Sequence, residues 1–338
     1  MKIPKITFIT NGNENIGSTR LRVYRIAEAL RGLGYDAVIN RDIDNADILV
    51  FQKSGFSALL PLFIKARREK NKFLVFDIDD YADDTYRFFV AYADLVVTPS
   101  CYLRDKYLKV NRNIAIVDNV LDIHQPDCRL AQFDLRRLNK VWFGNRSNLQ
   151  ALHDTGLKDV TTITSGGDIE WNAETIDRDL QQFDLLVLPQ VKDSNGLAKS
   201  NCRMLKALYL GIPVLAQNMP FYVDLARRLN YPESMIVTDI DSWTEKCEDL
   251  RSGKLPFHYD FQAARRLILQ YYGIENIVDL WLRAVCAKKE DCKMQRLIKR
   301  WKMEICLLRT AIQRWVFTKR RLNSGRIRIK FFGISFKF

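Results

Sequence analysis

Short β-branched runs alternate repeatedly along this chain with longer stretches of helical periodicity. Strands that are buried on both faces and alternate with helices form parallel sheets covered by helices. The alternation therefore predicts an α/β protein built from parallel sheets. The expected strands lie at residues 5–10, 37–40, 47–51, 73–76, 94–100 and 113–119, and then at 140–145, 160–166, 183–189, 211–217 and 234–238.

The alternation is interrupted once, between His124 and Asn139, where the sequence is polar and lacks a sustained apolar period. The length of 338 residues is enough for two domains. We therefore expect two tandem Rossmann-like domains, helices that close the second domain, and a basic amphipathic helical tail. The predicted segments are residues 1–125 for the first domain, 126–139 for the linker, 140–258 for the second domain, 259–286 for the closing helices and 287–338 for the tail.

The net charge of +13 belongs to the tail. Residues 287–338 contain 16 Lys and Arg but three Asp and Glu, and the rest of the chain contains 37 of each kind. A neutral body argues against a nucleic-acid-binding fold. The tail has a helical seam with alternating spacings of four and three, formed by Met294, Ile298, Trp301, Ile305, Leu308, Ile312 and Trp315.

A basic amphipathic helix with tryptophan on its apolar side is suited to an anionic membrane interface. The same spacing fits a three-heptad coiled coil, and the charge fits a nucleic-acid arm. Acidic partners are nearly absent from the tail, so self-pairing would bring like charges together. We favour the membrane and expect no nucleic acid as a partner.

Other features predict a cytoplasmic protein, peripheral at the inner face of the cell membrane. No run of 18 apolar residues indicates a transmembrane helix, and the first apolar run predicts a buried strand rather than a signal peptide. The seven cysteines include no C-x-x-C pair, and the three histidines lack metal-ligand spacing. We therefore expect a reducing compartment and no metal site.

The run Lys199-Ser200-Asn201-Cys202-Arg203, followed by the stretch 207–214, resembles the donor-domain signature of GT-B glycosyltransferases. The nearest likeness is to the retaining enzymes that make bacterial surface polysaccharides, the family 4 (group 1) type. One departure concerns two glutamates of that family, whose positions hold Ala198 and Lys206 here. Supporting motifs occur in the family's order at residues 17–22, 98–100, 119–122, 142–145 and 189, so the likeness covers roughly residues 1–285.

The resemblance implies transfer of a sugar from a nucleotide-sugar to a lipid-linked glycan, lipopolysaccharide or capsule-type acceptor, without a metal or other cofactor. The first domain would bind the acceptor and the second the donor. The missing glutamates leave open a divergent subfamily, which we favour, a different stereochemical course or a weakened catalyst. Two other functions stay open: a catalytically silent GT-B domain that serves as an assembly partner, and a basic nucleic-acid-binding protein.

The candidate donor site has two parts, both expected after strands of the second domain. In the first, Ser200 or Asn201 caps a helix whose amino end holds a diphosphate, with Lys199 and Arg203 flanking it. The alternative is that Ser200 only caps the helix and that both cations are solvated. The second part is the loop around Arg146, which could pair with phosphate. The alternative for this loop is a polar turn without a ligand. Its candidate residues are Gly144, Asn145, Arg146 and Asn148.

The candidate acceptor site lies in the first domain. Asp79 or Asp80, at the end of a buried strand, could act as the general base, with Lys199 completing the catalytic set. The alternative is a helix cap beside solvated acids. At the start of the first helix, Gly17 allows a ligand to approach the backbone closely. Arg20 and Arg22 could bind an acidic or phosphate-bearing acceptor, or they are only charges on the helix surface. The residues assigned to acceptor binding are Gly17, Ser18, Arg20 and Arg22.

Overall fold

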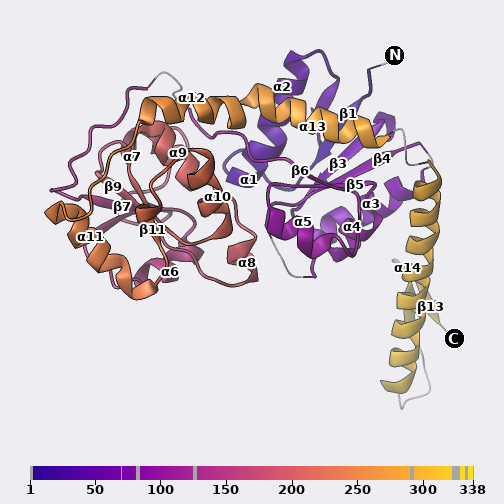
Figure 1. Cartoon of the computed structure of the whole chain (residues 1–338). Coiled ribbons are helices and arrows are strands. Elements are labelled where there is room, and N and C mark those ends of the chain that lie inside the picture. Colours follow the sequence, from indigo (N-terminus) through magenta and orange to yellow (C-terminus); the bar gives the residue numbers. More distant parts are fainter. Residues whose placement is uncertain are drawn as a thin grey trace.

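The computed structural model describes residues 3–69, 71–80, 84–124, 128–289, 293–321, 328–331 and 334–337. These residues form two α/β domains side by side, a pair of helices that connects them, and a long C-terminal helix (Figure 1). The predicted fold class is confirmed. Each of the runs that were expected to be strands overlaps a strand, which in several cases is shorter than the run.

The first domain contains a six-stranded parallel sheet in the order β2-β1-β3-β4-β5-β6. Successive side chains of each strand point to opposite faces. In β3, Leu49 and Phe51 pack against one group of helices, whereas Ile48 and Val50 pack against the other. The strands are β1 (Ile6–Ile9), β2 (Ala37–Ile39), β3 (Ile48–Gln52), β4 (Phe73–Asp77), β5 (Leu95–Thr98) and β6 (Ile114–Ile116).

Helices cover both faces of this sheet (Figure 1). The first helical stretch is continuous from residue 17 to residue 32 and includes a π-helical turn. π-Turns within helices occur frequently at functional sites. The elements are α1 (Gly17–Thr19), the π-turn (Arg20–Tyr24), α2 (Arg25–Gly32), α3 (Phe56–Arg68), α4 (Arg87–Tyr92) and α5 (Cys101–Tyr107).

The second domain contains a five-stranded parallel sheet in the order β11-β10-β9-β7-β8. Its strands are β7 (Lys140–Phe143), β8 (Val160–Ile163), β9 (Leu185–Leu188), β10 (Val214–Gln217) and β11 (Ile236–Val237). The helices around it are α6 (Leu149–His153), α7 (Ile176–Leu180), α8 (Ser194–Leu197), α9 (Cys202–Leu210), α10 (Pro220–Arg228) and α11 (Trp243–Ser252).

Gly211 ends α9 in a left-handed conformation, with φ of +87°. A Cβ atom there would lie 2.9 Å from the side chain of Leu130 and 3.0 Å from the backbone nitrogen of Ala131. The turn therefore needs glycine for its backbone angle and for the approach of the incoming chain.

The chain crosses between the domains twice, at neighbouring places. On the first crossing, Leu121 and Ile123 already pack against the core of the second domain. On the return, α12 (Phe261–Tyr272) packs on the second domain and α13 (Ile274–Lys289) packs on the first. The backbone amide of Leu121 donates to the carbonyl of Tyr272 at 2.9 Å and ties the crossings together. Within the predicted linker, residues 128–139 form no helix or strand, and residues 126 and 127 lie outside the described residues.

The tail forms α14 (Lys293–Arg321), followed by the antiparallel strands β12 (Arg328–Phe331) and β13 (Ile334–Lys337). The helix runs along the outer side of the first domain and extends beyond it (Figure 1). The expected helix is confirmed. Among the described residues, none of the helices combines the length and the apolar character needed to cross a membrane.

Candidate active site between the two domains

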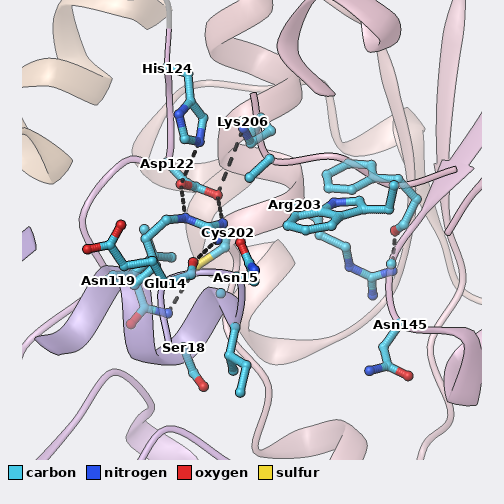
Figure 2. Close-up of a pocket in the computed structure, with 18 of the residues that line it drawn as sticks. Glu14, Asn15, Ser18, Asn119, Asp122, His124, Asn145, Cys202, Arg203 and Lys206 are labelled. Atoms are coloured by element: carbon cyan, nitrogen blue, oxygen red, sulfur yellow. Dashed lines mark hydrogen bonds and ion pairs between the residues drawn. The ribbon is translucent and has the colours of Figure 1, made fainter. Parts of the chain in front are cut away.

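A cleft of about 1380 Å³ lies between the domains, at the carboxyl ends of strands of both sheets. Ligands of open parallel sheets bind at this edge, because the loops there leave a crevice between neighbouring elements. Three parts of the chain line the cleft (Figure 2). They are the first domain, chiefly residues between 14 and 31, the crossing segment with Asn119, Asp122 and His124, and the second domain at residues 143–146, 164–165 and 170–174 and at four residues between 200 and 206.

The first helical stretch contributes Gly17, Ser18 and Arg20 to the cleft, as the assignment to acceptor binding requires. The guanidinium of Arg20 donates to both carboxylate oxygens of Asp122, at 3.1 and 2.8 Å. It also lies 5.8 Å from the ring centre of Trp171, which belongs to the second domain. Arg20 is therefore held in one orientation at the boundary between the domains.

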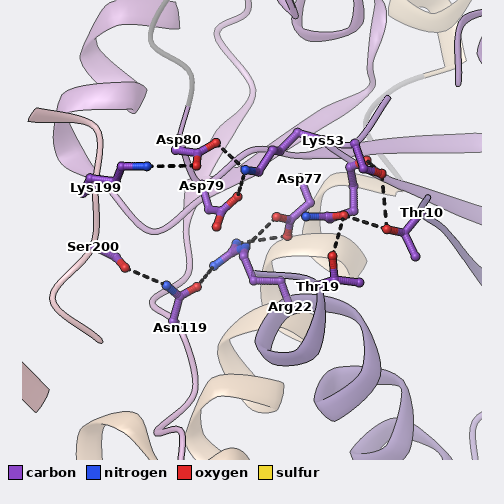
Figure 3. Close-up of polar contacts among 12 residues, drawn as sticks. Thr10, Thr19, Arg22, Lys53, Asp77, Asp79, Asp80, Asn119, Lys199 and Ser200 are labelled. Carbon is purple, nitrogen blue, oxygen red and sulfur yellow. Dashed lines mark hydrogen bonds and ion pairs between the residues drawn. The ribbon is translucent and has the colours of Figure 1, made fainter. Parts of the chain in front are cut away.

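Arg22 does not line the cleft, so the structure corrects its assignment to acceptor binding. Its side chain is buried and donates to the two oxygens of Asp77 at 2.5 and 3.0 Å, and to the side chain of Asn119 at 2.7 Å (Figure 3). Residues two apart on a helix point in nearly opposite directions. When Arg20 faces the cleft, Arg22 consequently faces the interior.

Asp79 and Asp80 have different positions. Asp79 lines the cleft, and its Oδ1 lies 3.5 Å from Nζ of Lys53. Asp80 forms ion pairs with Lys53 and with Lys199 and is not part of the cleft wall (Figure 3). Of the two candidate bases, Asp79 is the one that a ligand in the cleft can reach.

Lys199 also lies outside the cleft wall. Its Nζ is 3.2 Å from Oδ2 of Asp80, so the pair links the second domain to the first. In this position Lys199 does not flank the cleft in which a phosphate would bind, contrary to the prediction. The reason is its ion pair with Asp80 of the first domain, which is remote in sequence and could not be predicted from neighbouring residues.

The amino end of α9 opens on the cleft, but not in the predicted way. The helix begins at Cys202, and Asn201 is its N-cap residue without a side-chain bond to the helix. The amide of Asn201 instead donates to the hydroxyl of Tyr272 at 3.4 Å, and Ser200 accepts from Asn119 at 3.0 Å. The contact of Ser200 with Asn119 therefore joins the two domains, whereas the contact of Asn201 with Tyr272 ties α9 to α12 on the second domain. Ser200 still lines the cleft, whereas Asn201 does not.

The side chain of Arg203 is oriented by three hydrogen-bond acceptors of the second domain. One guanidinium nitrogen donates to the carbonyl of Phe143 at 3.1 Å, and another to Gln190 at 2.8 Å and to the hydroxyl of Tyr222 at 3.3 Å. A Cβ atom on Gly144 would lie 3.1 Å from Nη1 of Arg203. Glycine at this position therefore leaves room for the guanidinium, which lines the cleft.

The loop after β7 contributes Gly144, Asn145 and Arg146 to the cleft. Asn145 accepts from the backbone amide of Ser147 at 2.9 Å and so begins a short 3-10 turn over Arg146–Asn148. Arg146 is exposed. Asn148, which was also assigned to the donor site, lies outside the cleft wall.

A chain of alternating charges, missed in the sequence, forms part of the cleft wall. Asp122 lies between Arg20 and Lys206, and Nζ of Lys206 is 2.5 Å from Oδ1 of Asp177. Burial raises the pKa of Asp122, but Lys206 and Arg20 outweigh burial and lower this pKa below its usual range. Asp122 is therefore ionised at neutral pH.

Asp177 and Asp122 neutralise the charge of Lys206, so this buried lysine is paired with acidic partners rather than left as a free cation. This arrangement could not be predicted from the sequence, because the four charged residues lie far apart along the chain. The one sequence feature that pointed to it is the position of Asp122 in the motif at residues 119–122. Among the described residues, no group of three or more His, Cys, Asp or Glu is arranged to hold a metal ion.

No family model matches this sequence, and no curated protein matches it. Solved structures do resemble it. HepE from Anabaena, in complex with UDP and glucose, has a TM-score of 0.57 and 14% identity, over 84% of this chain and 100% of that one. The apo form of the lipopolysaccharide outer core galactosyltransferase WaaB has a TM-score of 0.54 and 12% identity, over 84% and 99%.

Sucrose-phosphate synthase from Thermosynechococcus elongatus has a TM-score of 0.51 and 11% identity, over 87% of this chain and 99% of that one. These similarities cover 84% to 87% of this chain. The chain therefore has the two-domain GT-B fold of these glycosyltransferases.

Proposed function

We propose that this protein transfers a sugar from a nucleotide-sugar donor to an acceptor bound in the cleft. The observation that carries the proposal is the fixed guanidinium of Arg203 beside the amino end of α9. A departing nucleoside diphosphate gains negative charge as the glycosidic bond breaks. Positive groups that are already oriented stabilise this charge without reorganisation, and a helix amino end adds unpaired N–H groups.

The second domain holds the donor in this proposal, with Arg203 and Arg146 near the phosphates. The first domain holds the acceptor, beside Gly17, Ser18 and Arg20. Asp79 is the proposed general base, because it is a carboxylate of the first domain that lines the cleft. The cations of the protein supply the charge in this mechanism, and no metal or other cofactor takes part.

The fold neighbours support the choice of donor, since HepE was solved with UDP and with UDP-glucose. We propose a lipid-linked glycan, lipopolysaccharide or capsule-type acceptor, as the sequence resemblance implies. We also place the protein at the inner face of the cell membrane, because its excess positive charge is confined to the amphipathic tail.

Binding of a nucleotide-sugar is tested directly by thermal unfolding with UDP-, GDP-, dTDP- and CMP-sugars. A ligand that binds only the folded state at 100 times its Kd stabilises the protein by about 2.7 kcal/mol. We expect one nucleotide class to raise Tm, with the free nucleoside diphosphate giving part of the effect. The proposal is wrong if no nucleotide-sugar raises Tm and none is consumed.

Replacing Lys199 with alanine should have a small effect. Its ion pair with Asp80 is partly exposed, and exposed pairs contribute at most about 1 kcal/mol. We expect kcat/KM to fall by about fivefold or less, which is the equivalent change in rate. The effect should shrink at high salt, where exposed charges are screened. A much larger loss, measured in steady-state kinetics, would return Lys199 to the catalytic set.

One feature favours the alternative of a silent GT-B domain, namely that Ala198 and Lys206 stand where the sequence resemblance implies two glutamates. Such a domain would bind a nucleotide-sugar without consuming it. Hydrolysis and transfer assays on the donor that raises Tm separate the two functions, because the enzyme releases the nucleotide of that donor (a nucleoside diphosphate, or CMP from a CMP-sugar) and the silent domain does not.

A further inference from the structure

The C-terminal helix α14 contacts the first domain through one face. Met303 is fully buried there. The ammonium of Lys299 donates to the carbonyl of Ala93, and Arg68 donates to both oxygens of Glu304 at 2.7 and 3.0 Å. The described part of α14 is therefore attached to the first domain by specific contacts, at the side of α4 (Figure 1).

The opposite face of α14 carries an apolar stripe. It consists of Leu297, Ile298, Trp301, Ile305 and Leu308, whose exposed fractions lie between 45% and 65%. A helix turns by about 100° per residue, so the middle of this stripe lies roughly opposite Met303. The contacts with the first domain leave the stripe uncovered, and exposed apolar patches of this kind mark interaction sites.

The charged residues beside the stripe indicate which class of partner can bind to it. Lys302 and Arg309 are exposed and flank it on one side, and Arg300 lies on the other. Glu304, the acidic residue among the described side chains of α14, is bound by Arg68. Pairing with a second copy would therefore bring cations together, whereas an anionic lipid surface offers both hydrocarbon and negative charge.

We propose that the stripe of α14 inserts into the interface of an anionic membrane, and that the contacts of its opposite face hold the first domain, the proposed acceptor domain, at that surface. This inference deepens the membrane placement proposed above and rests on it. It gives the placement a specific surface and fixes which domain lies near the lipid. An acceptor with a lipid anchor would thus be presented to the domain that binds it.

The test is flotation of the full-length protein with vesicles of phosphatidylcholine alone or with about one third phosphatidylglycerol. We expect binding to the anionic vesicles and little binding to the neutral ones. The variant Ile298→Ser/Trp301→Ser/Ile305→Ser should bind anionic vesicles at least about tenfold more weakly, because its apolar contribution is lost. Its positive charge is unchanged, so charge alone cannot explain the loss.

A matched control replaces three leucines of similar exposure elsewhere, Leu33→Ser/Leu108→Ser/Leu269→Ser. The control should bind vesicles like the unaltered protein. Acyl chains labelled with bromine should quench the tryptophan fluorescence of the unaltered protein, and less that of the stripe variant, since Trp301 enters the hydrocarbon in our proposal. Equal loss in both triple variants, or no quenching, would overturn it.

Two further results would overturn the choice of partner. One is a dimer in light scattering that the stripe variant abolishes, which would assign the stripe to a second copy of the chain. The other is binding of duplex DNA in preference to anionic vesicles. Nucleotide-dependent changes in Tm, measured on the same preparations, keep failure of this inference separate from failure of the proposed sugar transfer.

Discussion

Replacing Arg203 with alanine is expected to lower kcat by about 10²–10³-fold, the usual loss when one fixed donor to a developing negative charge is removed. The guanidinium is oriented by Phe143, Gln190 and Tyr222 before any ligand binds. Its stabilising effect on the leaving diphosphate therefore requires no rearrangement. Steady-state kinetics with the donor that raises Tm would measure the loss.

The conservative variant Arg203→Lys should have an intermediate effect, because lysine keeps the charge but not the planar set of donors that reaches three partners. Arg227→Ala is the matched control. Arg227 is an exposed arginine in α10, 3.9 Å from Asp224, and its removal should leave kcat unchanged. Unchanged kcat in a folded Arg203→Ala variant would contradict the proposed position of the donor phosphates.

Replacing Arg22 with methionine is expected to destabilise the protein by about 3–5 kcal/mol, as happens when one partner of a buried ion pair is removed. The carboxylate of Asp77 would stay buried without its counter-ion, since both side chains are at most 3% exposed. The free energy of unfolding in urea measures this change. Replacing Asp77 with leucine in the same protein should recover part of the loss, because the uncompensated charge is then gone.

The control for this prediction is Arg87→Met, which breaks an exposed pair with Asp84. Such pairs contribute at most about 1 kcal/mol, so the control should stay near the stability of the unaltered protein. Steady-state kinetics distinguish a structural role of Arg22 from a role in acceptor binding. If Arg22 gripped the acceptor instead, Arg22→Met would raise KM for the acceptor and leave the free energy of unfolding nearly unchanged.

The candidate site could be located from the sequence only approximately. Arg203, Arg146, Asp79 and Arg20 were all predicted as site residues, and all four line the cleft, where the carboxyl ends of parallel strands meet. Lys199 and Asp80 were predicted as well, yet they pair with each other outside the cleft wall. A position near the end of a strand identifies the edge of the sheet, but it does not say which side chains turn into the crevice.

The strands, the two-domain architecture and the helical tail could all be predicted from local sequence. Local alternation of apolar and polar residues reports which face of an element is buried, and this information is contained in neighbouring residues. The charge of the tail was equally a property of sequence alone.

The partners of the charged residues, in contrast, could be identified only in the folded protein. Arg22 forms an ion pair with Asp77, Arg20 with Asp122, and Lys206 with Asp177. In each pair the two residues are far apart in the sequence. Only the structure also showed that α14 contacts the first domain opposite its apolar stripe. The physical reason is that an ion pair depends on distance in space, which two remote segments acquire only when the sheets and the crossing helices bring them together.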